Sequence, residues 1–251
     1  MWIRAAILAL AVAVAGCGGD EIDVLVFSRT TAYRHAPAID AGRTVLADRY
    51  DARVTEDPAA FEDLDGVDVV VLLHTNGPGV LRGAERRAFE RWVRDGGGVV
   101  AIHAAANADR DWAFYGELLG GARFRDHRPG PLQREAVRVE RHETTEDLPR
   151  RWVRSDEWYR FDPEPDAHVV ATVDGDPMAW WTQVGRGRAF YTAMGHAAEA
   201  WQEPLYREHV FAAIEWAQTT SEATASSSMT TGTGRLRRSP ARTWAAIASR
   251  K

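Results

Sequence analysis

The stretch VVAIHAAAN, residues 99–107, decides the fold. Three glycines precede it, and its four leading apolar residues run directly into His103 and three alanines. An unbroken apolar run bounded by glycine is typical of a strand that is buried on both faces of a sheet. The small residues after the strand favour a sharp turn into a helix, which would expose His103 at the turn. A buried, hydrogen-bonded histidine that supports the loop is the alternative.

The first half of the chain alternates between apolar runs and helical periodicity. The apolar runs predict strands at residues 22–28, 51–57, 67–75 and 99–104. A proline near the start of one segment and a glycine cap after the other favour helices over residues 36–50 and 81–98. This order indicates a parallel sheet with helices on both faces.

The second half follows a different pattern. Helices are predicted at residues 112–121 and 203–218, and strands at residues 135–142, 168–173, 178–184 and 188–194. Residues 135–142 alternate in polarity as an edge strand does, and the turn sequences DGDP and GRG separate the last three strands. We therefore expect one α/β domain over residues 22–218 with an antiparallel extension.

Both ends of the chain differ from this domain. Residues 1–17 combine one arginine, an apolar run and small residues before Cys17, the single cysteine of the chain. This pattern is typical of a bacterial lipoprotein signal, and it predicts a protein of the cell envelope, anchored to a membrane by lipid and facing the periplasm or the exterior. An exported protein without a lipid is the alternative. Residues 219–251 are rich in Ser, Thr, Ala and Gly, which predicts a disordered basic tail.

The charge of the domain argues against one class of partner. Seven of the 31 basic residues and one of the 36 acidic residues lie in the two terminal segments, which leaves 24 against 35 and a net charge near −11. A body this acidic is not expected to bind nucleic acid. The sequence does not indicate an oligomeric state.

Histidines follow several of the predicted strands. They are His35, His74, His103 and His196. Because the carboxyl ends of parallel strands meet at one edge of a sheet, we expect these side chains to share a site there. A single histidine at a strand end is more often structural, but several that converge favour a functional site.

Six separated motifs occur along the chain: VLVFSRTTAYRH (24–35), TEDPAAFEDL (55–64), GGGVVAIHAAAN (96–107), FYGELLGGARF (114–124), SDEWYRF (155–161) and AMGHAAEAW (193–201). In order and spacing they resemble the ThuA-like (trehalose utilisation) family over roughly residues 23–217. The resemblance implies an α/β fold: a flavodoxin-like three-layer sandwich of the class I glutamine amidotransferase-like superfamily, with a mostly parallel sheet and an antiparallel extension. It also implies an association with disaccharide metabolism.

The resemblance also implies where the chemistry lies. The parent superfamily uses a cysteine at the turn after the central strand and a His–Glu pair after a late strand. This chain has His103 in the first region and no cysteine after Cys17, which excludes glutaminase chemistry through a thiolate. His196 and Glu199 lie where the pair is expected. We expect His103 and His196 to transfer protons, with Glu157 or Glu199 as the carboxylate.

The expected substrate is a saccharide or a keto-sugar derivative, which the enzyme would isomerise, hydrolyse or cleave by elimination. Flat aromatic side chains and polar groups in or beside the motifs suit such a ligand. The residues expected to bind it are Arg34, His35, His74, Trp112, Tyr115, His127, Trp158, Tyr159 and Trp201. The ten tryptophans of the chain are equally suited to a hydrophobic core.

Two alternatives use the same residues. His103, His127, Glu157 and His196 offer nitrogen and oxygen ligands for zinc or another divalent ion, and the protein would then be a metal-dependent hydrolase. No short signature such as H-E-x-x-H occurs in the chain, so the leading hypothesis includes no cofactor. The second alternative is a non-catalytic, glycan-binding lipoprotein, because the separation of two carboxylates cannot be read from a sequence.

Overall fold

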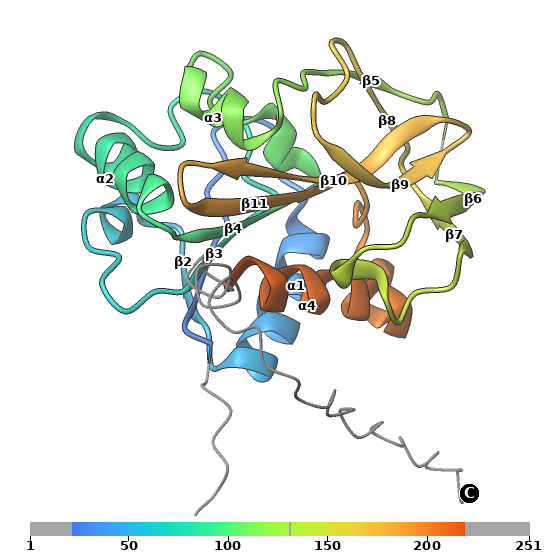
Figure 1. Cartoon of the computed structure of the whole chain (residues 1–251), viewed down its shortest axis with the longest axis horizontal. Coiled ribbons are helices and arrows are strands. Elements are labelled where there is room, and N and C mark those ends of the chain that lie inside the picture. The colour runs from blue at the N-terminus through green and yellow to red at the C-terminus, as the bar shows by residue number, and fades with distance from the viewer. Residues whose placement is uncertain (1–21, 131, 219–251) are drawn as a thin grey trace, which may run out of the picture. The chain divides into compact units, whose positions relative to one another are not determined.

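The computed structural model describes residues 22–130 and 132–218 (Figure 1). The expected lipoprotein signal with Cys17 and the expected tail at 219–251 lie outside the described residues. None of the helices in the described part combines the length and the apolar character needed to cross a bilayer. The domain expected over residues 22–218 is thus described in full except for Pro131.

Nine strands of the described residues form a mixed sheet. Its first five strands in spatial order are parallel: β2 (Arg53–Thr55), β1 (Val24–Phe27), β3 (Val69–Leu73), β4 (Gly98–Ile102) and β11 (Gly187–Thr192). The antiparallel extension follows with β10 (Asp176–Val184), β9 (His168–Val173), β6 (Gln133–Val139) and β7 (Arg151–Asp156). A separate antiparallel pair consists of β5 (Phe124–His127) and β8 (Tyr159–Phe161). The expected mostly parallel sheet with an antiparallel extension is confirmed, whereas β5, β7 and β8 were not predicted from the sequence.

Helices cover both faces of the sheet. On one side lie α1 (Ala36–Tyr50) and α4 (Pro204–Gln218), and on the other lie α2 (Gly83–Arg94) and α3 (Ala113–Leu118) (Figure 1). The short 3-10 helices are η1 (Pro58–Phe61), η2 (His103–Asn107), η3 (Glu143–Thr145) and η4 (Ala198–Gln202). This arrangement is the three-layer sandwich that the resemblance implies.

The central strands explain the unbroken apolar runs of the sequence. Every residue of β3 and β4 is buried. A strand that has a helix on each face of its sheet must present apolar side chains in both directions, so it loses the usual alternation of polarity. These strands form the rigid base from which the loops at their carboxyl ends project.

The expectation of an edge strand at residues 135–142 is wrong. The strand found there, β6, pairs with β9 on one side and β7 on the other, so β7 is the edge strand. The inward face of β7 carries Trp152, Arg154 and Asp156, all buried. Because two of these three residues are charged, β7 lacks the apolar alternation by which a strand is recognised in a sequence.

His209 of α4 is buried among aromatic rings. Its ring centroid lies 5.5 Å from that of Phe190 and 6.1 Å from that of Trp152. Neither ring nitrogen has a hydrogen-bond partner among the described residues. Burial, with a smaller contribution from the charge of Arg154, lowers the pKa of His209 from 6.5 to about 3. The folded protein therefore holds a neutral imidazole under conditions in which the unfolded chain would bind a proton.

We predict that His209→Leu reduces the loss of stability at acid pH. Between pH 6.5 and about pH 3 the unfolded chain binds one more proton at this residue than the folded chain. The free energy of unfolding therefore decreases as the pH is lowered through this range, by about 1.4 kcal/mol per pH unit for one such group. Chemical denaturation at pH 7 and pH 5 measures the effect.

The variant should lose less stability than the wild type between these two pH values. Ile214→Val, a non-titrating substitution at another buried position of α4, is the matched control and should leave the pH dependence unchanged. A pH dependence in His209→Leu equal to that of the wild type would show that this histidine does not titrate as described.

Candidate functional site

Four side chains meet at the carboxyl edge of the parallel strands. His35 lies in the segment after β1, His103 directly after β4 and His196 in the turn after β11, while Glu157 joins β7 to β8. Each offers one nitrogen or oxygen atom, and these four atoms lie within 4.8 Å of one another. We call this set the His–Glu cluster.

His103 is fully buried, and its orientation is set by one hydrogen bond. Nδ1 lies 2.6 Å from the carbonyl oxygen of Ala193. A carbonyl oxygen only accepts, so Nδ1 carries the hydrogen and Nε2 is left with a free lone pair in the neutral ring. Nε2 faces the other members of the cluster, at 3.2 Å from His196 Nδ1 and 3.4 Å from Glu157 Oε2. The remaining side of this triangle, His196 Nδ1 to Glu157 Oε2, is 3.1 Å.

Two of the histidines at the strand ends have a left-handed backbone. His74 has a φ of 53° and His103 a φ of 52°. This conformation is unfavourable for residues with a side chain and persists only where the surrounding structure imposes it. Such residues concentrate at functional sites, and at His103 the predicted turn leads directly from β4 into η2. The expectation that this turn exposes His103 is wrong, because the ring is fully buried and hydrogen-bonded to Ala193, as in the alternative.

The carboxylate of Asp156 connects the two parts of the site. It accepts hydrogen bonds from the backbone N–H groups of Gly195 (2.7 Å), His196 (3.1 Å) and Glu157 (2.9 Å). Its charge is balanced by Arg154, whose Nη1 lies 2.8 Å away, and both side chains are buried. The turn that carries His196 and the segment that carries Glu157 are therefore held by one group.

Gly195 is required in this turn for two reasons. Its φ is 103°, a conformation that residues with a side chain rarely adopt. A Cβ at this position would also overlap the hydroxyl group of Tyr206. The turn after β11 can therefore pass close to α4 and present His196 toward Glu157 only with glycine at this position.

Charges within the cluster are distributed unequally. Burial raises the pKa of Glu157, but hydrogen bonds and the charges of His103 and His196 outweigh burial and lower this pKa below its usual range. The hydrogen bond to Glu157 raises the pKa of His196 against the effect of burial. Burial, reinforced by the charges of His103 and His196, lowers the pKa of His35 to about 3. The site thus combines an ionised carboxylate, a histidine that favours its protonated form and a neutral histidine.

Three other residues expected at the site lie beside the cluster. Nδ1 of His127 is 3.6 Å from Glu157 Oε1, and this side chain is 44% exposed. The buried ring of Tyr159 packs on His103 with a centroid distance of 4.3 Å. His74 is fully buried behind His35 and His103, so it supports these rings and does not reach a ligand at the surface.

The structure places the other expected site residues elsewhere. Trp158 and Trp201 are core residues with 1% and 2% exposure, and the indole nitrogen of Trp158 donates to the backbone of Gln133. The guanidinium of Arg34 is paired with Glu56 at 2.7 Å. Glu199 is exposed on η4 and does not belong to the His–Glu cluster. Of the two expected carboxylates, Glu157 is therefore the one beside the histidines.

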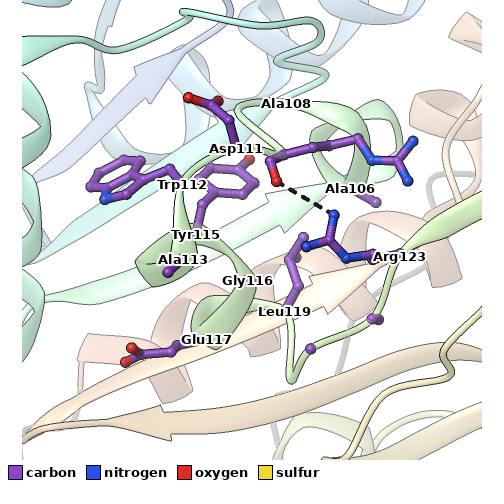
Figure 2. A pocket seen from close by; sticks show the side chains of 13 residues that line it. Ala106, Ala108, Asp111, Trp112, Ala113, Tyr115, Gly116, Glu117, Leu119 and Arg123 are labelled. Carbon is purple, nitrogen blue, oxygen red and sulfur yellow. Dashed lines mark hydrogen bonds between the residues drawn. The ribbon is translucent and has the colours of Figure 1, made fainter.

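Trp112 and Tyr115 line a different cavity, of about 470 Å³. Figure 2 shows it beside η2 and α3, with the guanidinium of Arg123 directed at the backbone carbonyl of Arg110. No member of the His–Glu cluster lines this cavity. The two aromatic residues thus do not share a pocket with the histidines.

One exposed aromatic residue beside the cluster follows the first predicted strand but is not among the residues expected from the sequence to bind the substrate. Tyr33 is 70% exposed, and its ring centroid lies 4.8 Å from that of His35. Asn76, after β3, donates from its side chain to the backbone oxygen of Tyr33 at 2.8 Å and so positions this segment. The position of Tyr33 two residues before His35 was the available signal, because both residues follow β1.

The fold and these motifs correspond to one protein family. The ThuA family, described as trehalose utilisation, matches residues 23–217. The chain therefore belongs to the ThuA family, and this membership associates it with the utilisation of trehalose or other sugars. A comparison with curated proteins finds no match.

Solved structures agree with this assignment. A protein described as ThuA-like from Bacteroides uniformis has 26% sequence identity and a TM-score of 0.68, over 78% of this chain and 91% of that one. A second protein described as ThuA-like, from Parabacteroides merdae, has 21% identity and a TM-score of 0.66, over 80% and 91% of the two chains. A β-galactosidase from Rahnella sp. R3 shares the fold alone, with 17% identity and a TM-score of 0.54 over 78% of this chain and 31% of that one.

Proposed function

We propose that this protein is a carbohydrate-processing enzyme whose reaction takes place at the His–Glu cluster. The supporting observation is the triangle of His103 Nε2, His196 Nδ1 and Glu157 Oε2, with sides of 3.2, 3.4 and 3.1 Å. Atoms at these distances can pass a proton from one to another. This equipment suits isomerisation, elimination or hydrolysis of a saccharide or a keto-sugar derivative, and membership of the ThuA family supports that substrate class.

The exposure of the three side chains suggests which of them contacts the substrate. The side chains of Glu157 and His196 are 18% and 27% exposed, whereas that of His103 is fully buried. A substrate can therefore touch Glu157, the ionised base, and His196, the histidine that favours its protonated form. His103 does not touch the substrate but exchanges protons with Glu157 and His196. Its hydrogen bond to Ala193 holds Nε2 toward both of these side chains.

The exposed ring of Tyr33 provides the surface for the sugar. Pyranose rings have apolar faces and hydroxyl groups at their edges, so they stack on aromatic side chains that border a polar site. Tyr33 has this position beside His35. His127, on the other side of Glu157, adds an exposed polar group that can bind a hydroxyl.

We predict that Glu157→Gln lowers kcat/KM by at least about 100-fold, because a positioned acid–base group contributes on the order of 10²–10⁴ to a rate. The measurement is turnover of a panel that contains trehalose, other disaccharides and their 3-keto derivatives. His168→Gln, at an exposed histidine outside the cluster, is the control and should retain wild-type rates.

Two results would contradict this proposal. One is a wild-type protein that binds sugars of the panel without turning over any of them, which would favour a non-catalytic glycan-binding protein. The other is a Glu157→Gln variant that is as active as the wild type.

We further propose that the protein is exported and anchored to a membrane by a lipid on Cys17, as the pattern of residues 1–17 suggests. In Cys17→Ser the protein should leave the membrane fraction and lose the mobility of the lipidated form on a denaturing gel. The circular dichroism spectrum should not change, because Cys17 precedes the domain. Unchanged partition into membranes with unchanged mobility would overturn the lipid anchor.

A further inference from the structure

We propose that His35, His103, Glu157 and His196 form a binding site for one divalent transition-metal ion such as zinc. This inference does not rest on the acid–base chemistry proposed above, because an ion would take the lone pairs that proton transfer uses, and it is argued from the geometry, hydrogen bonds and charges of the four side chains. Three nitrogen donors and one carboxylate are a ligand set that zinc and its neighbours in the first transition row accept.

The spacing of the donor atoms fits an ion. Zinc ligands lie at about 2.1 Å from the metal, so two ligand atoms of a tetrahedral site are about 3.4 Å apart. The three atoms of the triangle are separated by 3.1, 3.2 and 3.4 Å. His35 completes the set, since its ligand atom lies within 4.8 Å of all three.

Two of the three histidines are prepared to donate lone pairs. His103 Nδ1 is hydrogen-bonded to the carbonyl oxygen of Ala193, which leaves Nε2 free to bind a cation. A backbone carbonyl on the second ring nitrogen is the usual support of a metal-bound histidine, because it fixes the ring and its tautomer. In His35, Nδ1 is buried and has no hydrogen-bond partner among the described residues. A buried ring nitrogen without a partner costs free energy, and this one is free to accept a ligand bond.

No Arg or Lys side chain of the described residues forms an ion pair with Glu157, so its carboxylate is available to bind a cation. Arg154, a buried cation of β7, is paired with Asp156 at 2.8 Å and with Glu203 at 3.1 Å. Arg34 is paired with Glu56. In the described part of the chain, Glu157 has ion pairs with histidines alone. An anion that faces three imidazole rings in a largely buried space is a favourable position for a divalent cation.

The structure changes the ligand set that the sequence suggests. His127 approaches Glu157 with Nδ1, but this nitrogen lies 3.0 Å from the carbonyl oxygen of Arg128 and therefore carries a hydrogen. It cannot donate a lone pair in this orientation, and His127 is not one of the four residues whose ligand atoms converge. His35 takes its place. Because Glu157 and His196 remain partly exposed, one side of the ion would be open to water or to a substrate oxygen.

The test is metal binding by the whole mature protein after removal of metals with a chelator. Isothermal titration with Zn²⁺, followed by gel filtration and elemental analysis, should give one ion per chain. Co²⁺ in the same site should give the intense visible absorption of a four- or five-coordinate ion with nitrogen and oxygen ligands. Glu157→Gln and His196→Gln should weaken Zn²⁺ binding at least about tenfold and remove the Co²⁺ absorption.

Matched controls separate this site from binding at other histidines. His127→Gln and His168→Gln should each retain one ion and the Co²⁺ spectrum. Circular dichroism of every variant shows whether it is folded, and the partly exposed positions of Glu157 and His196 make folded variants the expected outcome. Less than one ion per chain in the wild type would overturn the proposal, and so would full binding by folded Glu157→Gln and His196→Gln.

Metal binding and sugar turnover are separate measurements, so failure of one proposal can be distinguished from failure of the other. A protein that turns over sugars but binds no ion would overturn the metal site and leave the enzymatic proposal intact. A protein that binds one ion at the cluster but acts on no sugar would overturn the enzymatic proposal and leave the metal site intact.

Discussion

The buried carboxylate of Asp156 is the group on which the candidate site depends. β7 lies four positions from β11 in the sheet, so strand order alone does not bring Glu157 to the histidines. The carboxylate bridges this separation by accepting backbone hydrogen bonds from Gly195 and His196 on one side and from Glu157 on the other. Each of these N–H groups would cost about 1–3 kcal/mol if it were left buried without a partner. The positions of the base and of its neighbouring histidine are therefore coupled.

The parallel strands supply the other half of the site. β3 and β4 are buried along their whole length, and the residue after each, His74 and His103, has a left-handed backbone. Strain of this kind costs about 1–3 kcal/mol per residue and is maintained by the packing of the strands beneath it. The buried imidazole rings of His74 and His103 therefore form the inner side of the site. Glu157 and His196, which are partly exposed, close the front and form the surface that a ligand can reach.

The parts of this arrangement that follow local rules could be predicted from the sequence. Apolar runs locate the central strands, and the meeting of parallel strand ends accounts for the proximity of His35, His103 and His196. The roles of Arg154 and Asp156 could not be predicted, because two charged residues on the buried face of a strand oppose the periodicity that identifies strands. The aromatic residues were ambiguous for a related reason: tryptophan suits a core and a sugar site equally, and the structure places Trp158 and Trp201 in the core.

The most direct test of this account is a pair of crystal structures, of the wild type and of Asp156→Asn. The amide keeps the size of the side chain but offers one acceptor oxygen in place of two and leaves Arg154 without its counter-charge. In the wild type, His196 Nδ1 should lie near 3.1 Å from Glu157 Oε2 and near 3.2 Å from His103 Nε2. In the variant, the turn at Gly195 should move, and both distances should exceed about 4 Å, beyond hydrogen-bonding range. A variant in which the cluster keeps its wild-type distances would contradict the central claim that Asp156 assembles the site.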